Sequence, residues 1–187
     1  MKKVLILAAL FCFAVPGLIA QEHVTLGVFG DYTRLGAINT NFYGLGGRIG
    51  FNAGRHFALE GETAYDFDQS YGGLLAGIPG NGGGLPYRTS VHLWSGLFGP
   101  KFESGGPIKL FVVAKGGFLN FAGGNPTFAN QVGQFGSNST YGVFYPGGGI
   151  EGHLGPIGLR LDVGDEIYFN NGANNNLKVQ VGPYFRF

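Results

Sequence analysis

The stretch HFALEGETAYDF, at residues 56–67, alternates between two kinds of side chain. An extended chain separates them into an apolar face with Phe57, Leu59, Thr63, Tyr65 and Phe67, and a charged face with His56, Glu60, Glu62 and Asp66. Successive side chains of a β-strand point to opposite faces of a sheet. The stretch is therefore predicted to be a strand that separates an apolar environment from a polar one.

The same period of two recurs along the rest of the chain, and no segment after the N-terminus has the period of an amphipathic helix. Each alternating segment is long enough to cross a bilayer as a tilted strand, which takes about 9–11 residues. The predicted strands are residues 24–35, 41–52, 56–67, 87–102, 108–121, 139–154, 157–169 and 177–187.

The connections between these strands alternate in length. Short links rich in Gly and Pro lie at residues 53–55, 104–107 and 155–156, and longer links lie at 36–40, 68–86, 122–138 and 170–176. In an up-and-down arrangement, all short links fall at one end and all long links at the other, as in outer-membrane barrels. The predicted fold is therefore all-β, an eight-stranded antiparallel up-and-down transmembrane β-barrel.

The composition fits a membrane wall better than a soluble or disordered chain. Glycine accounts for 37 of 187 residues, but 44% of the chain is hydrophobic and no Gly-X-Y repeat is present, which excludes collagen and low-complexity disorder. Charged residues make up 12% and aromatic residues 15%. Within strands, glycine permits the sharp bends and close backbone approaches that a narrow barrel needs.

The N-terminus resembles a secretory signal. Lys2 and Lys3 precede an apolar run at residues 4–15, which predicts a signal peptide at residues 1–20 and a barrel domain at 21–187. Cys12, the only cysteine, lies in the predicted signal peptide, so the exported chain would have no disulfide. Without Lys2 and Lys3, ten basic residues oppose eleven acidic ones, a balance that argues against nucleic-acid binding.

One face of each strand is predicted to meet lipid, including Val91, Leu93 and Leu97 in segment 87–102. The other face would line the lumen. It carries seven acids and seven bases: Asp31, Glu60, Glu62, Asp66, Glu151, Asp162 and Glu166, with Arg48, Arg88, Lys109, Lys115, Arg160, Lys178 and Arg186. An eight-stranded barrel has room inside only for its own side chains, and unpaired buried charges are costly. The balanced set therefore predicts a paired polar plug.

Few residues suggest chemistry. His56, His92 and His153 are predicted to face inward near the short turns, where a barrel enzyme acting on lipid A in the outer leaflet could not use them. We therefore expect no catalytic, cofactor or metal site and no enzymatic activity. The long loops are the expected working surface, for adhesion or recognition. Three alternatives stay open: a small pore, a lipid A-modifying enzyme and a soluble lipocalin-like barrel.

Four short motifs carry a family resemblance: LFGPKF at 97–102, GGGIE at 147–151, LRLD at 159–162 before an Asn-rich loop, and the terminal GPYFRF at 182–187. They resemble the small OmpA/OmpX-like eight-stranded outer-membrane barrels, in particular acidobacterial-type sequences. The resemblance implies residence in the Gram-negative outer membrane, among lipid and lipopolysaccharide. It also implies that Phe185 and Phe187 form a C-terminal insertion signal recognised by the barrel assembly machinery. The loop ligand is unidentified.

Overall fold

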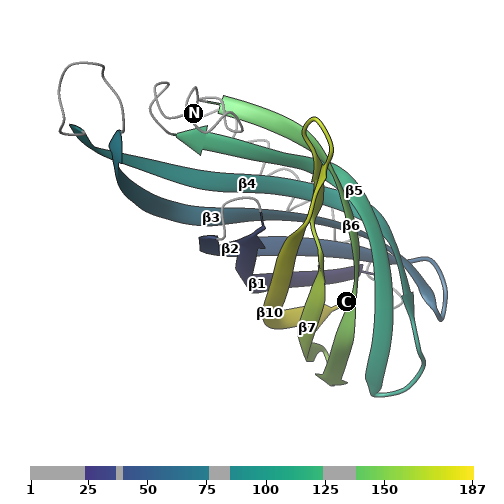
Figure 1. The fold of residues 1–187 in the computed structure, drawn as a ribbon. Coiled ribbons are helices and arrows are strands. Elements are labelled where there is room, and N and C mark those ends of the chain that lie inside the picture. The colour runs from purple at the N-terminus through teal and green to yellow at the C-terminus, as the bar shows by residue number, and fades with distance from the viewer. Residues whose placement is uncertain (1–23, 37–39, 76–84, 124–137) are drawn as a thin grey trace, which may run out of the picture.

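The computed structural model describes residues 24–36, 40–75, 85–123 and 138–187, with the backbone alone described at 69–75, 85–90, 123 and 138. The predicted signal peptide lies outside these residues. The described chain consists of strands joined by turns (Figure 1): β1 (Val24–Leu35), β2 (Thr40–Asn52), β3 (Phe57–Leu75), β4 (Leu85–Glu103), β5 (Ile108–Gly123), β6 (Asn138–Leu154), β7 (Ile157–Asp165), β8 (Ile167–Phe169), β9 (Ala173–Asn174) and β10 (Asn176–Arg186). This part of the chain contains no helix long and apolar enough to cross a membrane.

The strands form a closed antiparallel barrel. Hydrogen bonding follows the order β5-β4-β3-β2-β1-β10-β7-β6, and pairing between β5 and β6 closes the sheet. β8 continues β7 in the same register against β6, and β9 leads into β10 across a break at Asn175. The ten segments therefore make eight barrel strands, and the predicted eight-stranded antiparallel barrel is confirmed.

Asp165 marks the break in the last hairpin. Its carboxylate accepts hydrogen bonds from the Asn175 side chain at 2.7 Å and from the backbone N–H of Asn176 at 3.0 Å. The predicted seventh strand, 157–169, is thus two segments, because the Asp165 carboxylate, and not a backbone carbonyl, accepts the hydrogen bond from the Asn176 N–H.

The hairpin of β3 and β4 is longer than predicted and extends beyond β1 and β2 in Figure 1. The two strands pair as far as Leu75 and Leu85, so most of the predicted loop 68–86 is strand. A bulge between Asp66 and Gln69 shifts the register by one residue. The alternation of inward and outward side chains is interrupted at such a bulge, because two residues on one strand lie opposite one residue on the other. The sequence pattern therefore did not predict that the strands continue beyond it.

The outward face is mainly apolar, but the prediction for β4 was wrong by one residue. Val91, Leu93 and Leu97 are buried inside the barrel. The outward side chains of β4 are instead Trp94, Phe98 and Phe102, with exposed fractions of 49, 58 and 53%. Apolar residues occupy both phases of this segment, so alternation alone could not choose between them. The register decides, because Leu97 lies directly opposite Glu62, and directly opposed residues share a face.

Two glycines make room for the buried ring of Tyr145. Gly147 on β6 pairs with Gly164 on β7, and the ring of Tyr145 packs against both. A Cβ at Gly147 would lie 2.7 Å from the ring, and one at Gly164 would lie 2.6 Å from it. Tyr145 is fully buried as a result. Here the close approach, rather than a turn, requires glycine within a strand.

Candidate functional site in the barrel lumen

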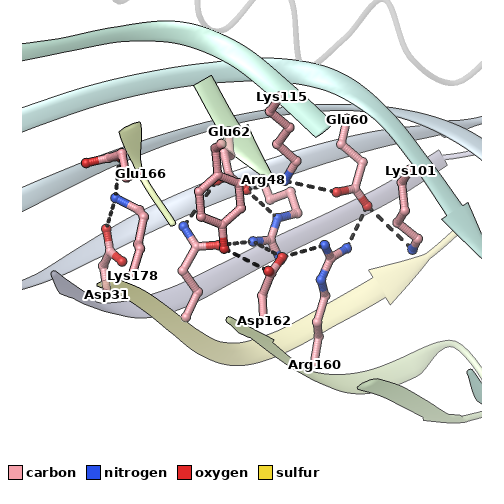
Figure 2. A network of polar contacts seen from close by, with 12 residues as sticks. Asp31, Arg48, Glu60, Glu62, Lys101, Lys115, Arg160, Asp162, Glu166 and Lys178 are labelled. Carbon is pink, nitrogen blue, oxygen red and sulfur yellow. Dashed lines mark hydrogen bonds and ion pairs between the residues drawn. The ribbon is translucent and has the colours of Figure 1, made fainter. Parts of the chain in front are cut away.

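Glu60 and Glu62 on β3 are the centre of an ion-pair network in the lumen (Figure 2). Lys115 on β5 lies 2.7 Å from Glu62 and 3.2 Å from Glu60. Arg48 on β2 donates to Glu62 at 2.8 Å, and Arg160 on β7 donates to Glu60 at 2.6 Å. Three bases on three different strands therefore converge on two adjacent inward positions of one strand.

Asp162 on β7 connects the arginines of this network. Arg160 donates to it at 2.8 Å, and Arg48 lies 3.5 Å away. The Tyr145 hydroxyl donates to the other Asp162 oxygen at 2.9 Å. Gln180 on β10 accepts from Arg48 and donates to Glu62 at 3.1 Å. Both oxygens of the fully buried Asp162 carboxylate therefore have polar partners.

The network continues toward the short turns through Lys101 on β4. This ammonium group lies 2.8 Å from Glu151 and 2.8 Å from Glu103, and 3.5 Å from Glu60. Glu103 also accepts a hydrogen bond from Lys109. Lys101 and Glu103 were absent from the predicted set, because the wrong phase for β4 directed Lys101 toward lipid. The sequence signal that could have placed them is the lysine itself, which would be costly on a lipid-facing wall.

A second group, which we call the loop-side cluster, lies farther from the short turns. Lys178 on β10 forms ion pairs with Asp31 at 2.8 Å and with Glu166 at 3.1 Å. Figure 2 shows these three residues apart from the rest. Asp66 is also part of the cluster, since Gly44 pairs with Asp31 on one side and with Asp66 on the other. All four side chains are buried.

The two groups differ in charge balance. Among the described side chains, the group nearer the short turns, which we call the turn-side network, joins five bases to five acids: Arg48, Lys101, Lys109, Lys115 and Arg160 with Glu60, Glu62, Glu103, Glu151 and Asp162. The loop-side cluster has one base, Lys178, and three acids. Within the described part of the chain, Asp66 Oδ1 and Glu166 Oε2 have no hydrogen-bond partner. The predicted even balance of acids and bases is therefore met only near the turns.

Two predicted members of the set lie elsewhere. Arg186 is half-buried at the turn-side mouth of the barrel, beside Asn52, Arg55 and Glu103. The side chain of Arg88 lies outside the described residues. The remaining twelve predicted residues line the lumen, and each takes part in the turn-side network or the loop-side cluster.

Apolar side chains fill the lumen beside β4, β5 and β6. The buried cluster there includes Leu93, Leu97, Phe111, Val113, Leu119, Phe121, Val143 and Tyr168. A cation lies over one of its aromatic rings: the Arg160 guanidinium is 3.8 Å from the centroid of the Phe111 ring. Aromatic faces attract such groups, especially where water is excluded. The sequence prediction missed this apolar half because it placed the β4 side chains outside.

The histidines are dispersed. His92 lies on the outward side of β4, where its Nδ1 is 3.0 Å from Asp68 and its ring stacks near Tyr65, so its predicted inward orientation was wrong. His56 is exposed in a short turn, with Nδ1 2.9 Å from the Glu103 carbonyl oxygen. His153 is half-buried close to the short turn at residues 155–156. Within the described residues, no group of three or more His, Cys, Asp or Glu side chains has an arrangement that could hold a metal ion.

The last strand presents both terminal aromatic rings outward. β10 pairs with β1 and β7. Phe185 and Phe187 have exposed fractions of 45 and 46%. Their neighbour Tyr184 is buried in the lumen, as alternation requires.

A closed eight-stranded antiparallel barrel with an apolar exterior and a charged interior is the fold of the small outer-membrane β-barrels. Three solved structures share it. OprG of Pseudomonas aeruginosa matches with a TM-score of 0.55 and 8% identity over 89% of this chain and 96% of that one. Ail of Yersinia pestis, the attachment invasion locus protein solved with the heparin analogue sucrose octasulfate, matches with a TM-score of 0.54 and 10% identity, covering 88% and 97%. Neisserial surface protein A matches with a TM-score of 0.53 and 11% identity, covering 88% and 96%.

These identities relate the chains by fold alone. No family model matches the chain, and no curated protein sequence matches it.

Proposed function

We propose that this chain is an integral outer-membrane protein whose lumen is plugged by its own side chains and whose long loops act at the cell surface. The observation that carries the plug is the turn-side network, in which one carboxylate, that of Glu60, contacts bases from three strands, β4, β5 and β7. An ion could cross the lumen only if several of these ion pairs broke at once. Breaking a buried pair costs about 3–5 kcal/mol.

The free space inside the lumen agrees with a plug. A void beside Phe29, Arg48, Lys101 and Arg160 has a volume of about 20 Å³. On this measure one water molecule needs about 10–15 Å³, so this void has room for about one water molecule and not for a continuous column of water. A small pore is the alternative, and it requires the turn-side network to open.

The membrane setting is supported by the outer surface. Large apolar side chains are exposed around the whole barrel, among them Leu45, Val112, Leu159 and Val181. A monomer in water rarely exposes contiguous apolar surface of this extent. Partners of the wall would be the lipid and lipopolysaccharide of the outer membrane, and the barrel assembly machinery would insert the chain through Phe185 and Phe187.

Surface recognition is proposed for the loops, by analogy with Ail, an attachment invasion locus protein solved in complex with a heparin analogue. The segments predicted as loops, 68–86 and 122–138, whose ends belong to strands β3 to β6, are rich in Gly, Asn, Gln and aromatic residues, which suit hydrogen bonding to sugars or proteins. No enzymatic step is part of the proposal, because the contacts of His56 and His92, to the Glu103 carbonyl oxygen and to Asp68, include no nucleophilic side chain.

Three measurements test the proposal. Membrane fractions should release the chain only with detergent, and the folded chain should migrate differently on gels before and after boiling. In planar bilayers the purified chain should give no steady ion conductance. Steady conductance would overturn the plug, whereas release without detergent would overturn the membrane setting and favour the soluble barrel.

A further inference from the structure

An apolar groove crosses the outer surface of β1, β2 and β3 beside β10. Its volume is about 540 Å³, and its lining residues with outward side chains or outward Cα atoms are Leu26, Val28, Gly47, Ile49, Gly61, Thr63 and Phe185. The backbones of Arg48 and Glu62 also border it, but their charged groups meet each other in the lumen. We call this feature the outer groove.

Two glycines create the depth of the outer groove, and packing of the barrel does not require them. A Cβ at Gly47 would meet no atom closer than 3.9 Å, and one at Gly61 would lie 3.6 Å from Phe98 and 3.7 Å from Ile49. These are ordinary van der Waals distances. They differ from the close contacts at Gly147 and Gly164, where the Tyr145 ring excludes any side chain. Larger residues would fit at positions 47 and 61, so the hollow is space left free on the wall.

The chemistry of the groove selects an apolar occupant. Thr63 has the one side-chain hydroxyl on its lining, and this group is already engaged, since it accepts from Trp94 Nε1 at 2.9 Å and donates to the Ser95 carbonyl at 3.0 Å. Water held here would find almost no polar partner, although a buried water usually makes about three hydrogen bonds.

A second copy of the chain is a poor occupant. Copies related by a two-fold axis place the same patch against itself. A concave groove facing its own copy would leave a void, and voids forfeit dispersion contacts. A flexible hydrocarbon chain can follow the hollow instead, and the surrounding outward side chains Leu26, Val28 and Ile49 already face hydrocarbon in the proposed setting.

We infer that the outer groove binds an acyl chain of a membrane lipid, a conclusion that rests on the proposed membrane setting. Lipid tails are as apolar as leucine, so selective retention must come from packing rather than from the hydrophobic effect. The groove supplies this packing, because Leu26, Val28, Ile49 and Phe185 line it around the two glycines, so that a seated chain contacts side chains as well as the floor. A lipid seated there would exchange more slowly than lipids elsewhere around the barrel.

Trp94 is a built-in reporter for this site. It is the only tryptophan of the chain, it is half exposed on the outer wall, and it is hydrogen-bonded to Thr63 in the groove lining. Bromine atoms on an acyl chain quench tryptophan fluorescence at short range. The full-length protein can therefore be reconstituted with phosphatidylcholine carrying brominated acyl chains, extracted in mild detergent and purified. Its fluorescence is then compared with that of a preparation made with unbrominated lipid.

Gly47→Leu fills the groove, and Gly142→Leu is the matched control. A Cβ at Gly142 on β6 meets nothing within 4 Å, and β6 lies across the barrel from β2. The wild type and Gly142→Leu should keep lipid-dependent quenching after purification, whereas Gly47→Leu should lose it. If Gly47→Leu fails the heat-modifiability test for folding, Gly61→Leu takes its place.

Each other outcome counts against the inference. Equal quenching in wild type and filled variant, or none in the wild type, overturns lipid retention in the groove while leaving the membrane setting intact. A wild-type dimer that Gly47→Leu dissociates, measured by light scattering, would assign the groove to a second copy. Release from membranes without detergent would instead mean that the proposed function itself has failed.

Discussion

Glu60 and Arg160 are 100 residues apart in sequence, and their side chains meet at 2.6 Å inside the barrel. β3 and β7 are not hydrogen-bonded to each other, so this contact spans the lumen rather than following a strand pair. Lys115 lies 3.2 Å from the second Glu60 oxygen. A single carboxylate thereby ties together parts of the barrel that the sheet itself does not join.

Replacing Glu60 should therefore be costly. Glu60→Gln removes one acid from the turn-side network, so its bases, Arg160 and Lys115 among them, outnumber its acids. We expect the free energy of unfolding to fall by about 3 kcal/mol, the lower part of the range for breaking a buried ion pair. Urea titration in lipid vesicles, followed through Trp94 fluorescence, measures it. Asp68→Asn is the control, because Asp68 is exposed, and loss of its contact with His92 should cost about 0–1 kcal/mol. A cost for Glu60→Gln no larger than that of Asp68→Asn would show that the network does not stabilise the fold.

Lys178 and Lys109 should respond differently to the same change. Lys178→Met removes the one base that pairs with Asp31 and Glu166, so we expect a loss of about 3–5 kcal/mol in the free energy of unfolding. Lys109→Met leaves Glu103 still paired with Lys101 at 2.8 Å, and should cost less. The same urea titration compares the two. The reverse order would mean that the loop-side acids find other partners.

Gly44 should tolerate no side chain. An added Cβ would lie 2.7 Å from the Asp66 Cα and would also press on the Asp66 carboxylate. Overpacking of this kind costs about 1–3 kcal/mol, so Gly44→Ala should lower both the unfolding free energy and the fraction of chain that folds. Gly116→Ala is the control, because its Cβ would meet nothing closer than 3.9 Å. Gel migration before and after boiling gives the folded fraction, and equal behaviour of the two variants would contradict the tight contact.

The orientation of β4 can be tested with single cysteines at adjacent positions. A spin label at Phe98→Cys should be relaxed strongly by molecular oxygen dissolved in lipid, because Phe98 faces outward with an exposed fraction of 58%. A label at Leu97→Cys should be relaxed weakly, since Leu97 is buried in the lumen. Power saturation of the paramagnetic resonance signal distinguishes the two sites. The opposite ranking would restore the orientation predicted from the sequence, in which Leu97 faces lipid.

Much of the barrel was readable from local pattern. Segments such as 24–35 and 56–67 each have one apolar and one polar face, and the sorting of turn lengths orders them into an up-and-down barrel. Most of the charged residues predicted for the lumen, including Glu60, Asp162 and Lys178, do lie inside. These features follow from the period of two in a strand, which each segment carries within its own sequence.

The sequence alone thus determined the number of strands, the antiparallel closure and, in most strands, which face meets lipid, because alternation is a local property. Only the tertiary structure decided the phase of β4, since that strand is apolar on both faces and the register with Glu62 chooses between them. It also decided which charges meet. Lys101 joins the turn-side network, and Asp66 joins the loop-side cluster across Gly44, through neighbours that come together only when the sheet closes.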